Sequence, residues 1–271
     1  AAKYIKMAAD NGIENAMILI ALLAETGTGF DKKELKIADK YYKMAADQFK
    51  SIRACKTYMR FLNKNRRFID ANKYMVLAGK AGDAECLYGS ALYHYVNKNR
   101  TECEKCLKLA IDKGNADAMN FYGSMMISKK PDESLKMLKK AIEKGSVPAM
   151  FTYASYLSEG RFPSSLSVDK NDIFKYMKLA ADNNFKEAVI KCAEMLHDGR
   201  NCEKNIKESL NYYKKAADLF NIPSAQYIYG EALLTGCDGL IEINQKVGAS
   251  YVKKAADQKF SSAIQKLGVL Y

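Results

Sequence analysis

Three short motifs in the sequence could carry chemistry, and each lacks the companions that this chemistry needs. Cys103 and Cys106 form a C-x-x-C pair, but a zinc site needs further ligands and no second pair occurs. Ser250 and Lys253 match S-x-x-K, but no S-D-N or K-T-G motif accompanies them. Residues 27–29, Gly-Thr-Gly, lack the third glycine and the distal acid of a dinucleotide-binding fingerprint. These matches therefore do not predict a metal site, an active site or a cofactor site.

Histidine and cysteine usage leads to the same expectation. The only histidines, His94 and His197, have no nucleophile and no set of metal ligands near them in the sequence. We therefore predict no catalytic activity, no cofactor and no metal. The 7 cysteines are irregularly spaced, which is typical of a reducing compartment, and we expect a cytoplasmic protein. The longest apolar run, residues 16–24, is too short to span a membrane.

A basic segment is the remaining candidate for a binding site. The chain has 43 Lys and Arg against 31 Asp and Glu, and residues 48–74 contain eight basic residues and one acid. Five of these cations are spaced so that a continuous helix would align them on one face. They are Arg53, Lys56, Arg60, Lys64 and Arg67. We hypothesise that this basic stripe binds an acidic partner; the alternative is a solvated helix face.

The elements that must position this stripe are repeated helices. Phrases such as YYKMAAD at 41–47 recur, and the first alanine of each A-A pair, or its equivalent, defines an anchor. The eight anchors are 31 to 39 residues apart: Ala8, Ala45, Ala78, Ala110, Ala141, Ala180, Ala216 and Ala255. A turn and a second helix with small residues follow each anchor. We expect one array of helix pairs, not two separate domains.

The repeat also carries paired charges. In seven of the eight units a lysine precedes the anchor by two residues and an acid follows it by two, as Lys43 and Asp47 do around Ala45. Each lysine thus has an acid at i+4, which predicts ion pairs within single helices. Such pairs would cancel most of the field of the repeated lysines.

The repeat resembles the Sel-1-like repeat family, which is related to the tetratricopeptide repeats. The most specific stretch combines residues 25–31, which look like the family's G-x-G loop, with residues 36–47, which look like its Y-Y-x-K-A-A helix. The resemblance covers essentially the whole chain. It implies an all-α fold, a right-handed superhelical α-solenoid of about eight helix-turn-helix repeats. A plain tetratricopeptide array is the alternative, but its nearly constant period does not fit these intervals.

The resemblance implies a non-catalytic scaffold or adaptor that binds other proteins through an extended repeat surface. The alternative is a docking module whose basic N-terminal repeats bind an acidic polymer, either an acidic cytoskeletal protein surface or nucleic acid. Nucleic acid is disfavoured because Tyr58, Phe61 and Phe68 are spaced as core contacts rather than base-stacking groups. Some family members work in the secretory pathway, so the lumen of the endoplasmic reticulum is the alternative location.

We expect residues 1–271 to form a single repeat array that continues in a longer chain. The first residue is Ala1, not Met, and the repeat pattern opens inside a helix. The sequence makes no prediction of the oligomeric state.

Overall fold

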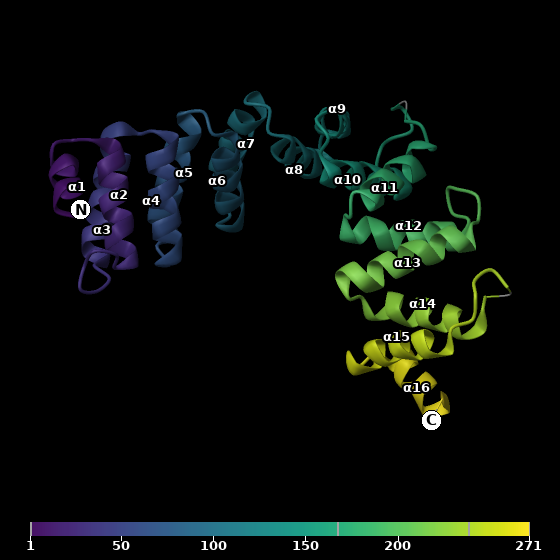
Figure 1. Ribbon diagram of the computed structural model, residues 1–271. Helices are drawn as coiled ribbons and strands as arrows, with labels where there is room; N and C mark the ends of the chain where they lie inside the picture. The colour runs from purple at the N-terminus through teal and green to yellow at the C-terminus, as the bar shows by residue number, and fades with distance from the viewer. Residues whose placement is uncertain (1, 167, 238, 271) are drawn as a thin grey trace. The chain divides into compact units, whose positions relative to one another are not determined.

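The computed structural model describes residues 2–166, 168–237 and 239–270, and this part of the chain forms sixteen α-helices and no strand (Figure 1). The helices are α1 (Ala2–Asp10), α2 (Glu14–Thr26), α3 (Leu35–Phe49), α4 (Ile52–Lys64), α5 (Phe68–Lys80), α6 (Ala84–Val96), α7 (Arg100–Asp112), α8 (Ala116–Met126), α9 (Pro131–Glu143), α10 (Val147–Ser158), α11 (Asp172–Asp182), α12 (Lys186–Asp198), α13 (Ile206–Phe220), α14 (Pro223–Thr235), α15 (Gln245–Asp257) and α16 (Ser261–Leu270). Nearly all close packing joins helices that are neighbours in the chain. The predicted all-α helical repeat solenoid is confirmed.

Two compact units divide the chain within α8: unit 1 ends at Tyr122 and unit 2 begins at Gly123. The main core cluster of unit 1 runs from α1 to α6 and includes the buried side chains of Tyr41, Tyr58 and Leu62. Unit 2 has core clusters of its own along α9 to α16.

The positions that the sequence marks as small lie in the tightest helix contacts. The anchors Ala45, Ala110 and Ala216 are fully buried. In unit 2 the backbones of α14 and α15 almost touch, since a Cβ atom on Gly248 would lie 2.8 Å from the carbonyl oxygen of Gly230. Small side chains therefore set how closely successive helices approach.

A hydrogen bond between a tyrosine and an aspartate joins successive repeats. The tyrosine four residues before an anchor donates its hydroxyl proton to the aspartate two residues after the preceding anchor. We call these four bonds the tyrosine ladder: Tyr41 to Asp10 (2.6 Å) and Tyr74 to Asp47 (2.9 Å) in unit 1, and Tyr212 to Asp182 (2.6 Å) and Tyr251 to Asp218 (2.6 Å) in unit 2.

The ladder tyrosines are held in their neutral, donating form. Burial, followed by the hydrogen bond to Asp10, raises the pKa of Tyr41 to about 12. Burial and the aspartate partner also raise the pKa of Tyr74, Tyr212 and Tyr251. A neutral phenol that donates to a carboxylate forms a charge-assisted bond, which is stronger than a bond between neutral groups.

The predicted ion pairs within single helices are mostly wrong, and Asp10, Asp182 and Asp218 bond a ladder tyrosine instead. Among the described residues, only Lys43 and Asp47 form such an i,i+4 pair between repeat positions, at 2.6 Å. Lys178 instead reaches Glu208, on the next helix pair, at 2.6 Å. Because four of the repeat aspartates face a tyrosine of the next repeat, their role is to join repeats more than to neutralise lysines.

The ladder is absent from the middle repeats, and the sequence shows why. Cys106 and Met137 occupy the tyrosine position there, and Lys80 and Glu143 replace aspartate at two of the acid positions. Where an aspartate at the acid position is followed by a tyrosine in the next repeat, the bond forms in every described case.

Removing a ladder hydroxyl should weaken the fold. We expect Tyr74→Phe and Tyr212→Phe each to lower the free energy of unfolding by about 1–3 kcal/mol, because a hydrogen bond from a buried tyrosine to a carboxylate is lost. Urea denaturation of the full chain measures this. Tyr4→Phe is the matched control, since Tyr4 occupies the same repeat position but is exposed and has no hydroxyl partner in the described structure. Equal stability of all three variants would contradict the ladder's role.

Two glycine substitutions should have opposite effects. Gly248→Ala should destabilise unit 2 by about 1–3 kcal/mol, because the new methyl group meets the backbone of α14. Gly268→Ala in α16 meets no atom within 4 Å and should be neutral or stabilising by up to about 1 kcal/mol. Thermal denaturation followed by circular dichroism distinguishes the two. A Gly248→Ala variant as stable as the parent would show that the close approach is not required.

Candidate binding surface

The basic stripe is the set of five cations predicted from the sequence: Arg53, Lys56, Arg60, Lys64 and Arg67. Helix α4 carries the first four, and Arg67 lies beyond its end. The helix ends at Lys64, where the side-chain amide of Asn65 donates to the Phe61 carbonyl oxygen at 2.8 Å. The next residue, Arg66, has a positive φ of 59°. The single continuous helical face that the spacing predicts therefore stops at Lys64.

The core fixes which way α4 faces. Ser51 starts the helix by accepting a hydrogen bond from the Ala54 amide at 3.1 Å. Tyr58, Phe61 and Leu62 are buried in the core of unit 1, on the opposite side of the helix from the cations. The four cations on α4 are consequently held toward its solvent side.

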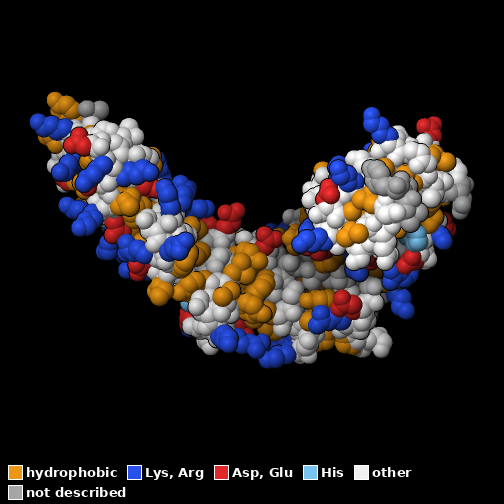
Figure 2. Space-filling model, turned by 90° about the horizontal axis from the view of Figure 1, so that it is seen from below, with side chains coloured by type: hydrophobic (Ala, Val, Ile, Leu, Met, Phe, Trp, Pro, Cys, Tyr) orange, Lys and Arg blue, Asp and Glu red, His pale blue; other side chains and the backbone are white. Residues whose placement is uncertain are grey.

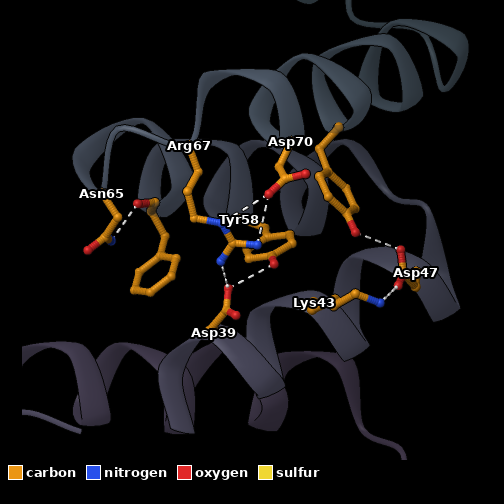
Figure 3. Close-up of polar contacts among 9 residues, drawn as sticks. Asp39, Lys43, Asp47, Tyr58, Asn65, Arg67 and Asp70 are labelled. Atoms are coloured by element: carbon orange, nitrogen blue, oxygen red, sulfur yellow. Dashed lines mark hydrogen bonds and ion pairs between the residues drawn. The ribbon is translucent and has the colours of Figure 1, made fainter. Parts of the chain in front are cut away.

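Arg67 stabilises the fold of unit 1. Its guanidinium contacts the carboxylates of Asp39 at 2.8 Å and Asp70 at 2.9 Å. Asp39 also accepts a hydrogen bond from the Tyr58 hydroxyl at 2.8 Å, so Arg67 joins α3, α4 and α5 in one cluster (Figure 3). Two carboxylates already satisfy this guanidinium, which leaves little of its charge for a partner.

Two further cations of the stripe are also paired. The ammonium of Lys56 lies 2.8 Å from Asp83 and 3.7 Å from Glu85. The ammonium of Lys64 lies 2.7 Å from Glu25 on α2. Both pairs are partly exposed, and they lower the charge that the surface offers to a partner.

Arg53 and Arg60 are the stripe members with charge to offer. Arg53 donates to the side-chain oxygen of Asn15 at 2.9 Å, which is a neutral partner. Arg60 makes no ion pair within the described residues, and both side chains are exposed. Figure 2 shows Lys and Arg side chains spread over the N-terminal helices at the left of the view.

Two exposed leucines lie beside these arginines. The Arg53–Asn15 and Lys64–Glu25 contacts hold α2 and α4 side by side at both ends. Between these contacts α2 exposes Leu19 and Leu22, with 42% and 46% of their surface accessible, and α4 exposes Arg60. We call the set Leu19, Leu22, Arg53 and Arg60 the α2–α4 surface. Apolar side chains next to unpaired arginines form a surface suited to binding a protein.

The sequence interpretation missed the two leucines, although a signal for them exists. They lie in the apolar run 16–24, where a helix with one buried face should expose polar residues. They occupy the repeat positions that Thr57 and Arg60 take in α4, as alignment on Ala16 and Ala54 shows. Apolar residues at outward repeat positions are therefore the pattern to look for.

The cysteines and the histidine considered for chemistry lie within helices, where Cys106 and His94 have polar side chains of other helices as neighbours. Cys103 and Cys106 are buried in α7, and the Cys106 thiol lies 3.7 Å from the Ser90 hydroxyl. The imidazole of His94 lies 3.3 Å from the Asn72 amide nitrogen. Among the described residues, no group of His, Cys, Asp and Glu is arranged to hold a metal ion. No described helix has both the length and the apolar character needed to cross a bilayer.

The family model described as Sel1 repeat matches five stretches of the chain: 15–48, 77–115, 116–146, 186–219 and 223–260. A comparison with curated proteins gives no match. The matched stretches include α2 and most of α3, while α4 lies between the first and second matches. The helix that carries most of the basic stripe thus lies, with α1 and most of α5, outside the matched stretches of unit 1.

Solved structures share the fold. A Sel1 repeat protein from Oxalobacter formigenes has a TM-score of 0.85 at 18% identity, covering 100% of this chain and 80% of that one. A protective antigen of uropathogenic Escherichia coli with an SLR fold has a TM-score of 0.72 at 19% identity, covering 100% of this chain and 59% of the antigen. Yeast Tom70 has a TM-score of 0.52 at 16% identity, covering 99% and 56%. At these identities the likeness establishes the fold alone.

The Lys56–Asp83 pair predicts how stability depends on pH. Burial pushes the pKa of Asp83 upward, but hydrogen bonds from Lys56 and the Cys86 amide outweigh it and hold the pKa below its ordinary value of 3.8. The contribution of this carboxylate is therefore complete above that value and is lost as the pH falls through the lower, folded-state pKa.

We expect Asp83→Asn to be less stable than the parent at neutral pH and to lose less stability below about pH 4. Asparagine retains the oxygen that caps α6 but not the charge. Asp257→Asn is the control, since Asp257 is exposed and has no hydrogen bond or ion pair in the described structure. Urea titrations from neutral to acid pH measure the difference. An Asp83→Asn variant with the parent's pH dependence would contradict the assignment.

Proposed function

Because the chain belongs to the Sel1 repeat family, we propose that it is a non-catalytic scaffold or adaptor that binds other proteins through its repeat surface. Repeat folds of this kind are commonly protein-interaction scaffolds. The observation that carries the proposal is the α2–α4 surface, in which Leu19 and Leu22 are exposed beside Arg53 and Arg60. In this proposal residues 1–271 act as one repeat array.

The partner proposed for this surface is a protein segment with both apolar and acidic side chains. Leu19 and Leu22 give the α2–α4 surface an exposed apolar area. Binding of the segment removes this area from water, which favours association. Arg53 and Arg60 are free to form charge-assisted hydrogen bonds with carboxylates, and arginine is enriched among the residues that dominate interface affinity. The remaining stripe members, Lys56, Lys64 and Arg67, contribute less because each already has an acidic partner.

A module that binds an acidic polymer is the second candidate, favoured by the excess of basic residues between 48 and 74. Its support is weaker, because the pairing of three stripe members lowers the charge available to a row of phosphates. A cytoplasmic location, with the lumen of the endoplasmic reticulum as the alternative, remains part of the proposal. It is supported by the 7 cysteines, all of which are free thiols.

Charge reversal at the two free arginines tests the proposal. We expect the Arg53→Glu/Arg60→Glu variant of the full chain to capture its protein partners from an extract of the source cells at least about tenfold less than the parent. Quantitative mass spectrometry of the co-purified proteins measures this. The matched control is Lys136→Glu/Lys140→Glu on α9, which changes the net charge equally at two exposed lysines without ion pairs in the described structure.

Unchanged capture by the arginine variant at physiological salt would contradict a role for the α2–α4 surface. A salt titration of the captured partner separates the two candidates. Binding of an acidic polymer should fall steeply with salt, whereas a contact anchored by Leu19 and Leu22 should depend on it weakly.

A further inference from the structure

A second apolar feature of unit 1 lies away from the α2–α4 surface. The first turn of α5 and the last turns of α6 line an open groove of about 530 Å³. Its lining residues are Phe68, Ile69, Leu92, Tyr93, Val96 and Asn97. The two most exposed of its large apolar side chains are Ile69 (79%) and Val96 (77%), which come from different helices.

These side chains are not used by the core. Helix α5 buries a different face, which includes Ala71, Tyr74 and Ala78, and α6 buries Leu87 and Ala91. A single exposed apolar residue is ordinary in a folded protein. Several that converge on one groove from two helices mark a site of interaction.

The groove lies in a strongly basic part of the chain. Residues 64–73 and 92–100 together contain six basic residues and one acid, Asp70. That acid is already paired with Arg67 at 2.9 Å. Lys64, Arg67 and Arg100 are already ion-paired. The cations of these segments that make no ion pair within the described residues are Arg66, Lys73 and Lys98.

Two of these cations lie within two residues of a lining residue in the chain. Arg66 precedes Phe68 by two residues in the turn before α5, and Lys98 follows Val96 by two residues in the turn after α6. Both have left-handed backbones, with φ of 59° and 58°, which is uncommon for residues other than glycine. Neither makes an ion pair within the described structure.

We propose that this groove binds an acidic segment of a partner protein. The segment inserts an apolar side chain between Ile69 and Val96, and its carboxylates lie against Arg66 and Lys98. The inference rests on the proposed scaffold function, because it names the chemistry of a partner and a second place of contact.

A peptide fits the groove better than a lipid surface does. Membrane-binding segments present apolar side chains on an outward face that enters the bilayer interface. Here the apolar side chains come from two helices and line an open groove between them, which can receive a side chain of a partner.

Three pools of short fluorescein-labelled peptides test the proposal against the full chain by fluorescence polarisation. The first pool is rich in Asp and Glu around two adjacent large apolar residues. The second replaces the apolar residues with Ser, and the third replaces Asp and Glu with Asn and Gln. We expect the first pool to bind at least about tenfold more tightly than either other pool.

Variants of the chain locate the binding. Ile69→Ser/Val96→Ser removes the apolar walls, and Arg66→Asn/Lys98→Asn removes the charges while keeping a residue that tolerates the left-handed backbone. Each should weaken binding of the first pool at least about tenfold. Leu219→Ser is the control, since Leu219 is an apolar residue of unit 2 with 58% exposure, and it should bind as the parent does.

Sedimentation of the full chain with vesicles of phosphatidylserine and phosphatidylcholine is measured in parallel. Three results would overturn the proposal: equal binding of the first two pools, unchanged binding in both groove variants, or binding of the chain to the vesicles and to none of the peptide pools. The Arg53→Glu/Arg60→Glu variant separates this inference from the proposed function, because binding of the first pool that this variant retains and the groove variants lose belongs to the groove. If that variant alone weakens peptide binding, the groove assignment fails and the α2–α4 surface stands. If the groove variants alone weaken peptide binding, and the Arg53→Glu/Arg60→Glu variant still captures every protein that the parent captures from the extract, the proposed role of the α2–α4 surface fails.

Discussion

The hydrogen bond from a repeat tyrosine to the aspartate of the preceding repeat is the interaction on which the arrangement of the outer repeats depends. A helical repeat contacts mainly its neighbours, so each junction must be specified locally. Small anchor alanines allow close approach, but alanine contacts alone would tolerate sliding along the helix axis. A directional bond such as that from Tyr212 to Asp182, 2.6 Å long, fixes the register of one helix pair against the next.

The same bond decides how charge is distributed over the surface. The four ladder aspartates accept from tyrosines at the junctions between repeats, and among them only Asp47 also pairs with a repeated lysine in the described structure. Ion pairs between different helices then determine which cations are free. Lys56, Lys64 and Arg67 are paired with acids on other helices or in the adjoining turn, and the charge available on the stripe is that of Arg53 and Arg60.

The sequence predicts the helices well because their signals are local. The anchor alanines and their spacing locate every helix pair, and the burial of residues such as Ala110 and Ala216 follows from it. The end of α4 was missed because the pattern contains no glycine there; the signal was Asn65, whose side chain binds the Phe61 carbonyl.

Contacts between distant segments could not be predicted from the sequence. The Lys64–Glu25 and Lys56–Asp83 pairs join residues 39 and 27 positions apart, and no periodicity relates them. The tyrosine ladder is intermediate in how far the sequence predicts it. Both partners stand at fixed repeat positions, so it could have been predicted by comparing adjacent repeats instead of searching each helix for i,i+4 pairs.

A double-mutant cycle on the Tyr212–Asp182 pair tests the central claim most directly. The free energies of unfolding of the parent, Tyr212→Phe, Asp182→Asn and the double variant give the coupling energy of the two side chains. The ladder predicts a favourable coupling of at least about 1 kcal/mol. Additive effects, with a coupling indistinguishable from zero, would show that alanine packing alone sets the junctions between repeats.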